Sequence, residues 1–427
     1  MTEPAIRQAF AYAVICFFVV FFFSDGLSNH ISTLRVPPGN NLPDFGQYQE
    51  LRSLPEEQFP LEDDKKRVIV VGDIHGSYKY LNTLLKKISY EPSSDILVHV
   101  GDIITKGPHN GSMEVLSYMA SNNITGVRGN HDQKVVEWRG WMKWINSLPG
   151  GRRWLEELNS KWGHAEASGA SPDVWLEDEK RKYKSKWWQM IPEGWSLLGD
   201  HYSVAHAMTE AEYKYLLALP LVIHVPTAHA YIVHAGILPS DPQYSHDHRR
   251  QPLARIPHLP TQFKGKTPSK HETYRILRKL QELAVVRQVP QNQVPYNLLN
   301  MRSIVDGKVT KDGDGRPWSK AWKHDVSRCQ GYDKEIDVMK HKKDLLPCYP
   351  STVIYGHAAS RGLDIKRWSI GLDSGCVYGR RLTALILGPK LKKRADDADD
   401  DVDANKDEKT IPFGEKGRGR IVSIPCS

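Results

Sequence analysis

Three short apolar runs, each followed by a polar loop that contains glycine, most constrain the fold of this 427-residue chain. The runs are predicted to be buried strands at residues 67–71, 95–100 and 124–127, and segments of helical period separate them. Alternating strands and helices with right-handed crossovers give a parallel sheet. All three loops would then leave the sheet at one carboxyl edge, which is where α/β folds bind ligands.

The three loops carry side chains that suit divalent metal ions. They read Gly72-Asp73-Ile74-His75-Gly76, Gly101-Asp102, and Gly129-Asn130-His131-Asp132. Carboxylate, imidazole and amide oxygen atoms are ligands for zinc, manganese or iron in mixed nitrogen and oxygen sites. One Gly-Asp turn followed by a histidine is ordinarily structural, but three such loops at one sheet edge indicate a metal site.

This arrangement resembles the calcineurin-like metallophosphoesterases, whose sequences carry GDxHG, GDxxxxG and GNH(D/E) followed by two distal histidines. Here the distal pair is His234 and His357, each directly after a predicted strand. Residues 371–379 and 382–387 look like the closing elements of the family, especially of its diadenosine tetraphosphatase branch. The resemblance implies an α/β fold in which mixed sheets form a sandwich flanked by helices.

The resemblance also implies two divalent metal ions, zinc foremost, with manganese, cobalt or iron as alternatives. Such a pair lowers the pKa of a water molecule that attacks phosphorus. The residues expected to hold the ions are Asp73, His75 and Asp102 for the first, and Asp102, Asn130, His234 and His357 for the second. His131 is expected to protonate the leaving oxygen. Lys106, Arg128 and Arg302 are expected to bind substrate phosphate.

Two positions depart from the pattern of the related serine/threonine phosphatases, which carry Asp-Arg-Gly after the bridging aspartate. Here Thr105 and Lys106 stand at those positions. Lysine offers a point charge rather than a bidentate fork, and threonine cannot stabilise an imidazolium as a carboxylate does. A phosphoanhydride has a better leaving group than a serine ester and needs less acid catalysis. The departures therefore favour a phosphoanhydride substrate.

Taken with the predicted membrane anchor, these features look like the zinc-dependent endopolyphosphatases of fungal vacuoles. The expected enzyme is a hydrolase that cleaves internal bonds of inorganic polyphosphate. A dinucleoside tetraphosphatase and a Ser/Thr phosphoprotein phosphatase are the alternatives, and an inactive membrane scaffold is disfavoured by the intact ligand set. The net charge of +8 suits an acidic ligand, but no nucleic acid partner is expected.

The N-terminus is predicted to be a leader at 1–8, a signal anchor at 9–24 and a stem at 25–66. Ala9–Phe23 is an unbroken apolar run that would span about 22 Å as a helix, and a cleaved signal peptide is the alternative. Arg7 favours a cytoplasmic N-terminus. The protein is thus expected to be a single-pass type II membrane protein with its catalytic domain in a lumen, that of the vacuole.

The metallophosphoesterase domain is predicted at 67–390, with a helical cap insertion at 137–195. This insertion is rich in tryptophan, which indicates either an aromatic core or a basic, aromatic rim that grips a polyanion. The acidic segment 391–417 is expected to be disordered, and 418–427 to form a strand that returns to the sheet edge.

Cysteines and glycosylation sequons bear on the predicted lumenal location. Cys329 and Cys348 are predicted either to pair in an oxidising lumen or to remain free thiols. Asn110-Gly-Ser and Asn123-Ile-Thr are acceptor sequences for N-glycosylation, so a lumenal protein would be a glycoprotein.

Overall fold

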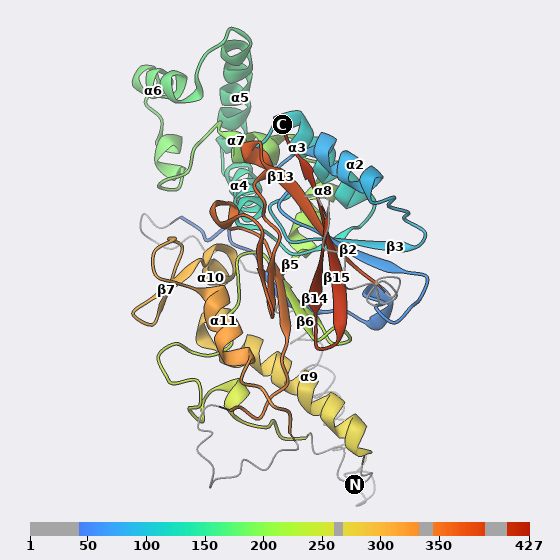
Figure 1. The fold of residues 1–427 in the computed structure, drawn as a ribbon. Helices are drawn as coiled ribbons and strands as arrows, with labels where there is room; N and C mark the ends of the chain where they lie inside the picture. The colour runs from blue at the N-terminus through green and yellow to red at the C-terminus, as the bar shows by residue number, and fades with distance from the viewer. Residues whose placement is uncertain (1–41, 260–267, 333–344, 389–407) are drawn as a thin grey trace, which may run out of the picture. The chain divides into compact units, whose positions relative to one another are not determined.

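The computed structural model describes residues 42–259, 268–332, 345–388 and 408–427 (Figure 1). The chain divides into two compact units. The smaller unit is Met1–Asp44 with Lys186–Gly194, and its described residues include a short 3-10 helix at Lys186–Met190. The larger unit, Phe45–Ser185 with Trp195–Ser427, contains the sheets and the site described below.

The first large sheet has the strand order β14-β15-β13-β2-β3-β4. Its strands are β2 (Arg67–Val71), β3 (Asp95–His99), β4 (Thr125–Gly126), β13 (Arg381–Leu387), β14 (Glu408–Phe413) and β15 (Gly417–Pro425). β2, β3 and β4 are neighbours and parallel, with Val68 beside Ile96 and His99 beside Gly126. This confirms the parallel unit predicted from the three apolar runs.

The second large sheet has the strand order β1-β5-β6-β10-β12-β11. Its strands are β1 (Gln49–Ser53), β5 (Pro220–Val225), β6 (Ala230–Val233), β10 (Thr352–Tyr355), β11 (Asp364–Lys366) and β12 (Ser369–Gly371). β10 is parallel to both β6 and β12, so the carboxyl ends of these three strands lie at one edge. A small third sheet is formed by β7 (Ser303–Val305), β8 (Lys308–Thr310) and β9 (Arg316–Pro317).

The two large sheets share one apolar core, which makes them the layers of a mixed α/β sandwich. Val70 and Leu385 of the first sheet belong to the same buried cluster as Ile232 and Ile354 of the second. Outside the first sheet, α2 (Tyr78–Lys87) lies against β13 and β15.

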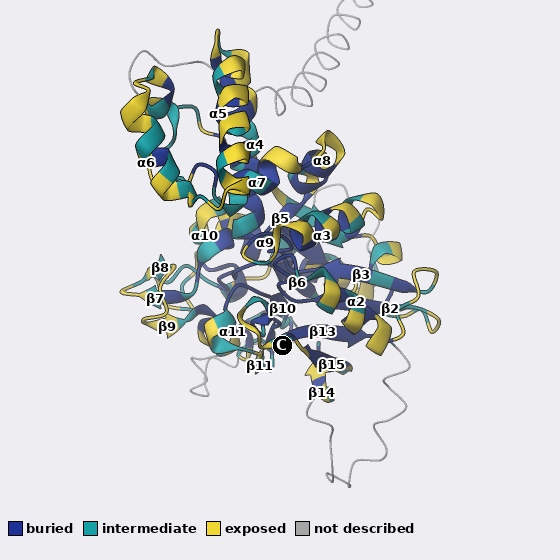
Figure 2. Cartoon of the chain, turned by 90° about the horizontal axis from the view of Figure 1, so that it is seen from above, coloured by how far each residue is buried: buried dark blue, intermediate teal, exposed yellow. Residues whose placement is uncertain are grey.

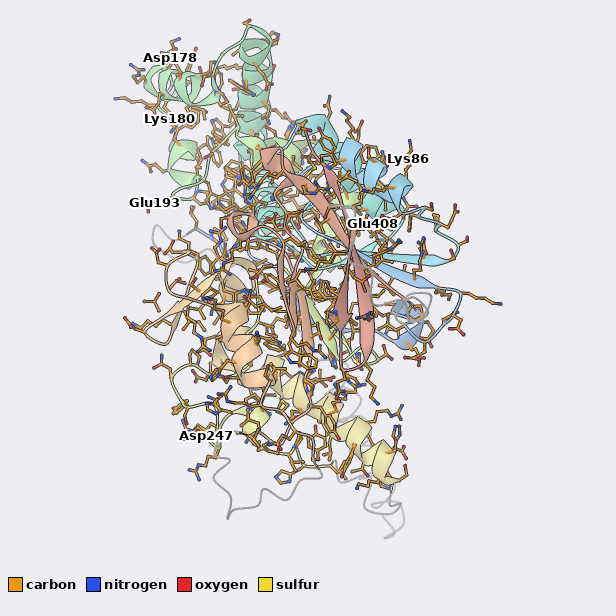
Figure 3. The ribbon with its side chains drawn as sticks, viewed as in Figure 1. Lys86, Asp178, Lys180, Glu193, Asp247 and Glu408 are labelled. Atoms are coloured by element: carbon orange, nitrogen blue, oxygen red, sulfur yellow. A yellow bond between two sulfur atoms is a disulfide. The ribbon has the colours of Figure 1, made fainter. Side chains whose placement is uncertain are left out.

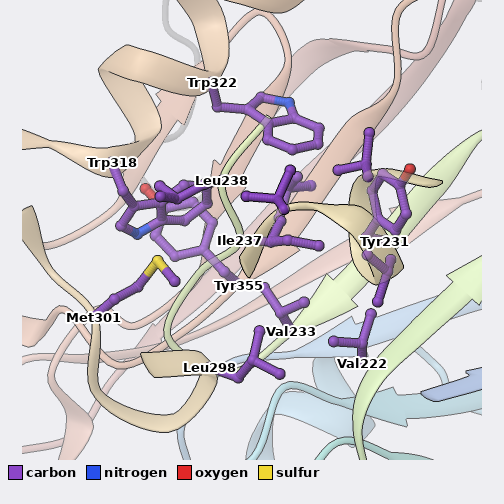
Figure 4. Close-up of a cluster of buried hydrophobic side chains, with 14 of the residues drawn as sticks. Val222, Tyr231, Val233, Ile237, Leu238, Leu298, Met301, Trp318, Trp322 and Tyr355 are labelled. Atoms are coloured by element: carbon purple, nitrogen blue, oxygen red, sulfur yellow. The ribbon is translucent and has the colours of Figure 1, made fainter. Parts of the chain in front are cut away.

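Helices cover the outer face of the second sheet as well. They are α9 (Lys270–Gln288), α10 (Pro295–Asn300) and α11 (Trp318–Val326). Figure 4 shows Trp318 and Trp322 of α11 packed beside Tyr355 and Tyr231 from the sheet. The helix-flanked sandwich expected from the family resemblance is therefore present.

A group of helices separates the third loop from β5. They are α4 (Asn130–Ser147), α5 (Gly151–Ala167), α6 (Pro172–Lys182), α7 (Asp200–Ala207) and α8 (Glu210–Ala218), and α3 (His109–Ser121) packs on the last two. The first helix that enters the predicted insertion at 137–195 is α4, which begins inside the third loop at Asn130.

The three tryptophans of α4 belong to the buried core of the larger unit. Trp138, Trp141 and Trp144 of α4 are buried, whereas the outward sides of α5 and α6 are exposed (Figure 2). On α6, Asp178 and Lys180 carry their charges on the outside of the helix (Figure 3), and Lys182 pairs with Asp178 at 2.6 Å. Its charges therefore offset one another, and the aromatic-core interpretation holds for α4.

The C-terminal strand β15 is not at the edge of its sheet, contrary to the prediction. It pairs with β13 on one side and with β14 on the other. β14 occupies 408–413, inside the segment 391–417 that was expected to be disordered. Ile411 and Phe413 are buried at alternate positions, so this stretch has the period of a strand rather than the composition of the acidic run. Residues 389–407 lie outside the described residues.

The predicted leader, the anchor and residues 25–41 of the stem also lie outside the described residues. Among the helices that the structure describes, none combines the length and apolar character needed to cross a membrane.

Two disulfides are present in the described chain. Cys329 pairs with Cys348, so of the two possibilities predicted for these cysteines the structure has the disulfide and not the free thiols. Cys376 pairs with Cys426 and joins the loop after β12 to the end of β15. The second pair was not anticipated, because 50 residues separate its members in sequence.

Candidate metal centre and active site

The predicted ligand residues come together at the carboxyl edges of the two sheets. Asp73 follows β2 and Asp102 follows β3, while Asn130 begins α4 directly after the β4 loop. His234 follows β6 and His357 follows β10. Because the strands that carry these loops run in the same direction within each sheet, their ends converge on one place.

Two clusters of potential ligand atoms share Asp102. In the first, Asp73, His75 and Asp102 each offer an atom within 4.8 Å of the others, and in the second Asp102, His234 and His357 do so. His75 Nε2 lies 3.6 Å and His234 Nε2 lies 3.4 Å from Asp102 Oδ2. The geometry thus places one carboxylate between two sites.

Asn130 belongs with the second cluster. Its Oδ1 lies 3.0 Å from His234 Nε2 and 2.9 Å from His357 Nδ1. The other nitrogen of each ring faces a backbone carbonyl, since His234 Nδ1 is 2.9 Å from Val100 O and His357 Nε2 is 3.3 Å from Asn300 O. An N–H donated to these carbonyls fixes the tautomer and leaves the inner nitrogens free as ligands.

The loops reach this arrangement through unusual backbone conformations. His75, Asp102 and His357 have φ values of 48°, 50° and 67°, in the left-handed region that non-glycine residues seldom adopt. Such conformations persist where the surrounding structure holds them, and they concentrate at functional sites. Gly129 is needed for close approach, because a Cβ there would lie 2.1 Å from Asp102 Oδ1.

Burial and opposite charges set the protonation of the cluster. Burial raises the pKa of Asp102, but the positive charges of His234, His131 and His75 outweigh it and hold that pKa well below its usual range. Burial disfavours the charged form of His234, yet Asp102 raises the pKa of the ring to about 9. Burial also raises the pKa of Asp73 well above its usual value, and repulsion from Asp373 adds to this.

The donor atoms fit two divalent metal ions. Asp73 Oδ1 and His75 Nδ1 are buried with no hydrogen-bond partner, so each lacks the interaction that a buried polar atom requires. A divalent ion near Asp73 and Asp102 would offset the repulsion of these buried carboxylates. Carboxylate, imidazole and amide oxygens together form a mixed nitrogen and oxygen donor set. With a pKa of about 9, the metal-free His234 ring carries a proton on both nitrogens at neutral pH. The inner nitrogen must lose its proton to bind a metal, so metal binding should weaken as the pH falls.

His131 lies beside the cluster, with its backbone N–H donated to Asp102 Oδ1 at 2.9 Å. Its ring meets the His75 ring edge to face, with centroids 5.3 Å apart. Burial lowers the pKa of His131 to about 3, and the nearby positive charge of Lys106 acts in the same direction. On its other side the ring is hydrogen-bonded to His201 of α7, a residue that the sequence motifs did not indicate.

A cavity of about 380 Å³ opens over the cluster. Its wall includes all the cluster residues except the fully buried His234, together with His131 and the predicted substrate residues Lys106 and Arg302. Arg380 and Tyr378 also line it, from the loop between β12 and β13. Within the larger unit, residues 137–185 and Trp195 of the tryptophan-rich range are not among the residues that line this cavity.

Arg128, which was predicted to bind substrate, does not reach this cavity. It is fully buried, and its guanidinium donates to the carbonyl oxygens of Gln47 and Leu217 and to Gln133 Oε1. The side chain therefore lies in the interior and is not among the residues that line the cavity. The prediction failed because adjacency to the Gly-Asn-His loop does not determine the direction of a side chain.

Two acidic residues of the site were also missed. Asp132 accepts hydrogen bonds from the backbone N–H groups of Asp102, Ile103 and Gly129, and thereby ties the second loop to the third. Asp373 lines the cavity two residues after β12. A signal for Asp373 was present, since Gly371-Leu-Asp373 repeats the pattern of a strand followed by glycine and aspartate.

Comparison with known proteins yields phosphatase relatives. Serine/threonine-protein phosphatase 1 of Salmonella typhimurium is 35% identical over 109 residues, which is 25% of this chain and 50% of that protein. The symmetrical bis(5'-nucleosyl)-tetraphosphatase of Buchnera aphidicola is 43% identical over 68 residues, 16% of this chain and 24% of that protein. The chain thus spans half or less of the length of these relatives.

A solved structure that is provisionally assigned as a diadenosine tetraphosphatase is similar to 88% of this chain over 98% of its own length, with a TM-score of 0.43 and 22% identity. The model of the calcineurin-like phosphoesterase family matches residues 66–287, more than half of the chain and all of the first three loops together with His234. With the motif residues gathered at one sheet edge, this match shows that the chain belongs to the calcineurin-like phosphoesterase family.

Proposed function

We propose that this chain is a two-metal phosphohydrolase that cleaves internal phosphoanhydride bonds of inorganic polyphosphate, as the fungal vacuolar endopolyphosphatases do. The observation that carries the proposal is the cavity wall, where Lys106, Arg302 and Arg380 surround the paired carboxylate and histidine clusters. Three cations exceed what a single phosphate group needs, and they suit a substrate with several phosphates in a row.

In this proposal Asp73, His75 and Asp102 would hold one metal ion, and Asp102, Asn130, His234 and His357 the other. The ions, when bound, supply an activated water and offset charge on phosphate oxygens. The carbonyl oxygens of Val100 and Asn300 keep the two distal imidazoles in the tautomer that a metal requires.

The protein groups around the ions have separate tasks. Lys106, Arg302 and Arg380 bind phosphate oxygens on either side of the bond to be cleaved. His131 protonates the leaving oxygen. Although burial lowers the pKa of His131, a polyphosphate anion in the cavity would favour its protonated form. A phosphoanhydride tolerates an acid that is only partly protonated, because its leaving group is already a stable anion.

A dinucleoside polyphosphate is the second candidate substrate, and Tyr378 is the observation that favours it. Its side chain is 59% exposed at the cavity. Lys106 lies 5.9 Å and Arg380 lies 5.8 Å from the centre of its ring. An exposed ring beside phosphate-binding cations could stack on a nucleobase.

We also propose a lumenal, membrane-anchored location, in the vacuole. The two disulfides support an oxidising compartment. Asn110 and Asn123, the sequon asparagines, are both exposed and thus accessible to glycosylation. Sensitivity of the cellular protein to endoglycosidase, with protection from external protease, would support this topology, whereas an unglycosylated and accessible domain would contradict it.

The substrate is tested with the purified full chain, stripped of metal and reloaded separately with zinc, manganese, cobalt or magnesium. Each form is given long-chain polyphosphate, diadenosine tetraphosphate and a phosphopeptide, and the products are resolved by length. We expect polyphosphate fragments of intermediate length to appear before free phosphate. A preference of about 100-fold or more for the nucleotide or the peptide would refute the proposal, since it would correspond to roughly 2.7 kcal/mol of transition-state discrimination.

A further inference from the structure

A second histidine stands beside the predicted general acid. His201 Nε2 lies 2.8 Å from His131 Nδ1, and the two rings are stacked with centroids 5.0 Å apart and planes 15° from parallel. A hydrogen bond between two neutral imidazoles needs one N–H donor and one acceptor. When His131 is protonated and donates through Nδ1 to His201, its Nε2–H remains to be transferred to the leaving oxygen, and the ring cannot rotate without losing the bond.

The position of His201 is fixed by contacts between α7 and the second metal loop. Asp200, the first residue of α7, accepts a hydrogen bond from the backbone N–H of Lys106. The neighbouring N–H of Thr105 donates to Ser112 Oγ at 3.0 Å. Thr105 and Lys106 have left-handed φ values of 69° and 62°, so these two bonds hold a turn that the residue types do not favour.

Side-chain packing also joins α7 to α4, the helix that carries His131. Trp138 of α4 and Tyr202 of α7 meet edge to face, with centroids 5.2 Å apart. Arg139 Nη1 of α4 donates to Ala205 O of α7 at 3.1 Å, and Tyr202 Oη ties α7 also to α5 by donating to Asn159 Oδ1 at 2.7 Å. The helices that carry the two histidines are therefore held to each other, so the contact between the rings does not depend on one mobile side chain.

We propose that His201 is a positioning residue that holds the ring of His131 for proton donation to the leaving group. In the related phosphatases an aspartate at the position of Thr105 would orient this histidine, but here that position holds a buried threonine. His201 would supply the orienting hydrogen bond instead. A neutral imidazole provides the hydrogen bond without an opposing charge, which suits a substrate with a good leaving group. The inference rests on the acid role of His131 in the proposed function, but it does not depend on which phosphoanhydride is cleaved.

The test compares four single variants and one double variant of the metal-loaded full chain. His201→Phe keeps a flat ring but removes the hydrogen bond, and His201→Gln keeps a donor and acceptor at similar reach. His206→Phe, at an exposed position of the same helix, is the matched control. His131→Ala serves as the background for a double-mutant cycle. Steady-state kcat and KM, metal content and melting temperature are measured for each on polyphosphate and on diadenosine tetraphosphate.

We expect His201→Phe to lower kcat about 10- to 100-fold, part of the 10²- to 10⁴-fold that a general acid contributes, with KM and metal content unchanged. His201→Gln should recover most of this loss, and His206→Phe should show none. In the His131→Ala background His201→Phe should lower kcat less than about twofold, because residues that act as one unit are not additive.

The inference is overturned if the two losses multiply, or if the Gln variant is as slow as the Phe variant. If His201→Phe loses metal or melts early, His201→Gln is compared with His201→Met, a chain of equal length without hydrogen-bonding groups. Equal kcat for that pair would also overturn it. A nucleotide-specific enzyme with the expected cycle would refute the proposed polyphosphate function and leave the role of His201 intact.

Discussion

The sheet edge and the helices α4 to α7 position functional residues in different ways. At the edge, Asp73, Asp102 and Gly129 are held by backbone turns, glycines and main-chain hydrogen bonds. In the helices, His201 is held by the packing of large side chains such as Trp138 and by one contact of Asp200 with the second loop. The first kind of site is local in sequence, whereas the second exists only once the helices have packed.

Substitutions in the two regions should therefore impair the enzyme in different ways. A substitution at the edge should remove the metals and with them the activity, since every ligand there depends on its neighbours. A substitution among the helices should leave the metals bound and change only the geometry of proton transfer. Metal content measured beside turnover therefore separates the two regions.

The largest effect is expected for Asp102→Asn, which removes the carboxylate shared by both clusters. Activity should fall by at least about 10³-fold, because an amide is a weaker ligand and the activated water depends on both ions. Bound metal, measured by mass spectrometry after dialysis, should fall with it. The control is Asp312→Asn at an exposed position. Full metal content in the Asp102 variant would contradict the shared site.

His131→Ala lies where the two regions meet, because its backbone contacts Asp102 and its ring contacts His201. We expect turnover to fall about 10²- to 10⁴-fold, the usual contribution of a general acid. The metals should remain, since the backbone N–H that binds Asp102 is unchanged. Undiminished kcat in single-turnover measurements would remove His131 from the mechanism.

The parts of the site that could be predicted from the sequence are those in which function and backbone conformation share a few consecutive residues. The loop that carries Asp73 and His75 is recognisable because the same short stretch ends a strand, turns on glycine and supplies ligands. Right-handed crossover then determines which edge it reaches. The parallel order of β2, β3 and β4 followed from these rules alone.

The remaining parts depend on contacts between distant segments. His201 is 70 residues from His131 in the chain, and the motifs carry no mark of the pairing. Arg128 follows a predicted strand as the ligands do, yet its side chain turns toward the interior. The pairing of Cys376 with Cys426 required the C-terminal strand to lie beside β13, and the sequence predicted the strand but not its neighbour in the sheet.

Trp138→Leu tests the packing of the helices with a smaller expected effect. The change removes edge contacts to Tyr202 and Trp195 and should cost about 2–4 kcal/mol of stability, as other large-to-small core changes do. Turnover should fall about tenfold with the metals retained, because part of the catalytic contribution of His131 is lost as α7 shifts. Trp175→Leu, whose ring contacts Trp162 instead, is the control. Unchanged kcat in the unstable variant would show that α7 is positioned by Asp200 alone.

The smallest effect concerns His99, a buried histidine of β3 beneath the edge. Gly101 N donates to its Nδ1, so Nε2 carries the proton toward Tyr215 Oη, 2.9 Å away. Burial lowers the pKa of this ring to about 3, well below its value in the unfolded chain. Below about pH 6.5 the unfolded state binds a proton at His99 that the folded state does not bind. The contribution of His99 to the free energy of unfolding is therefore fully present above that pH and is lost as the pH falls toward 3.

For this group alone the loss approaches about 1.4 kcal/mol per pH unit. His99→Gln removes the proton but keeps polar atoms in place, so the variant should be less stable than the wild type near pH 7 and the difference should shrink as the pH falls. This stability difference is measured by urea unfolding between pH 7 and pH 4 with metals chelated. His164→Gln, at an exposed position, is the control. A stability difference that is independent of pH would mean that His99 accepts a proton in the folded state. Protonation of His99 in the folded state would show that the edge admits a charge beneath its loops, and the backbone-held edge would then be less rigid than its hydrogen bonds indicate.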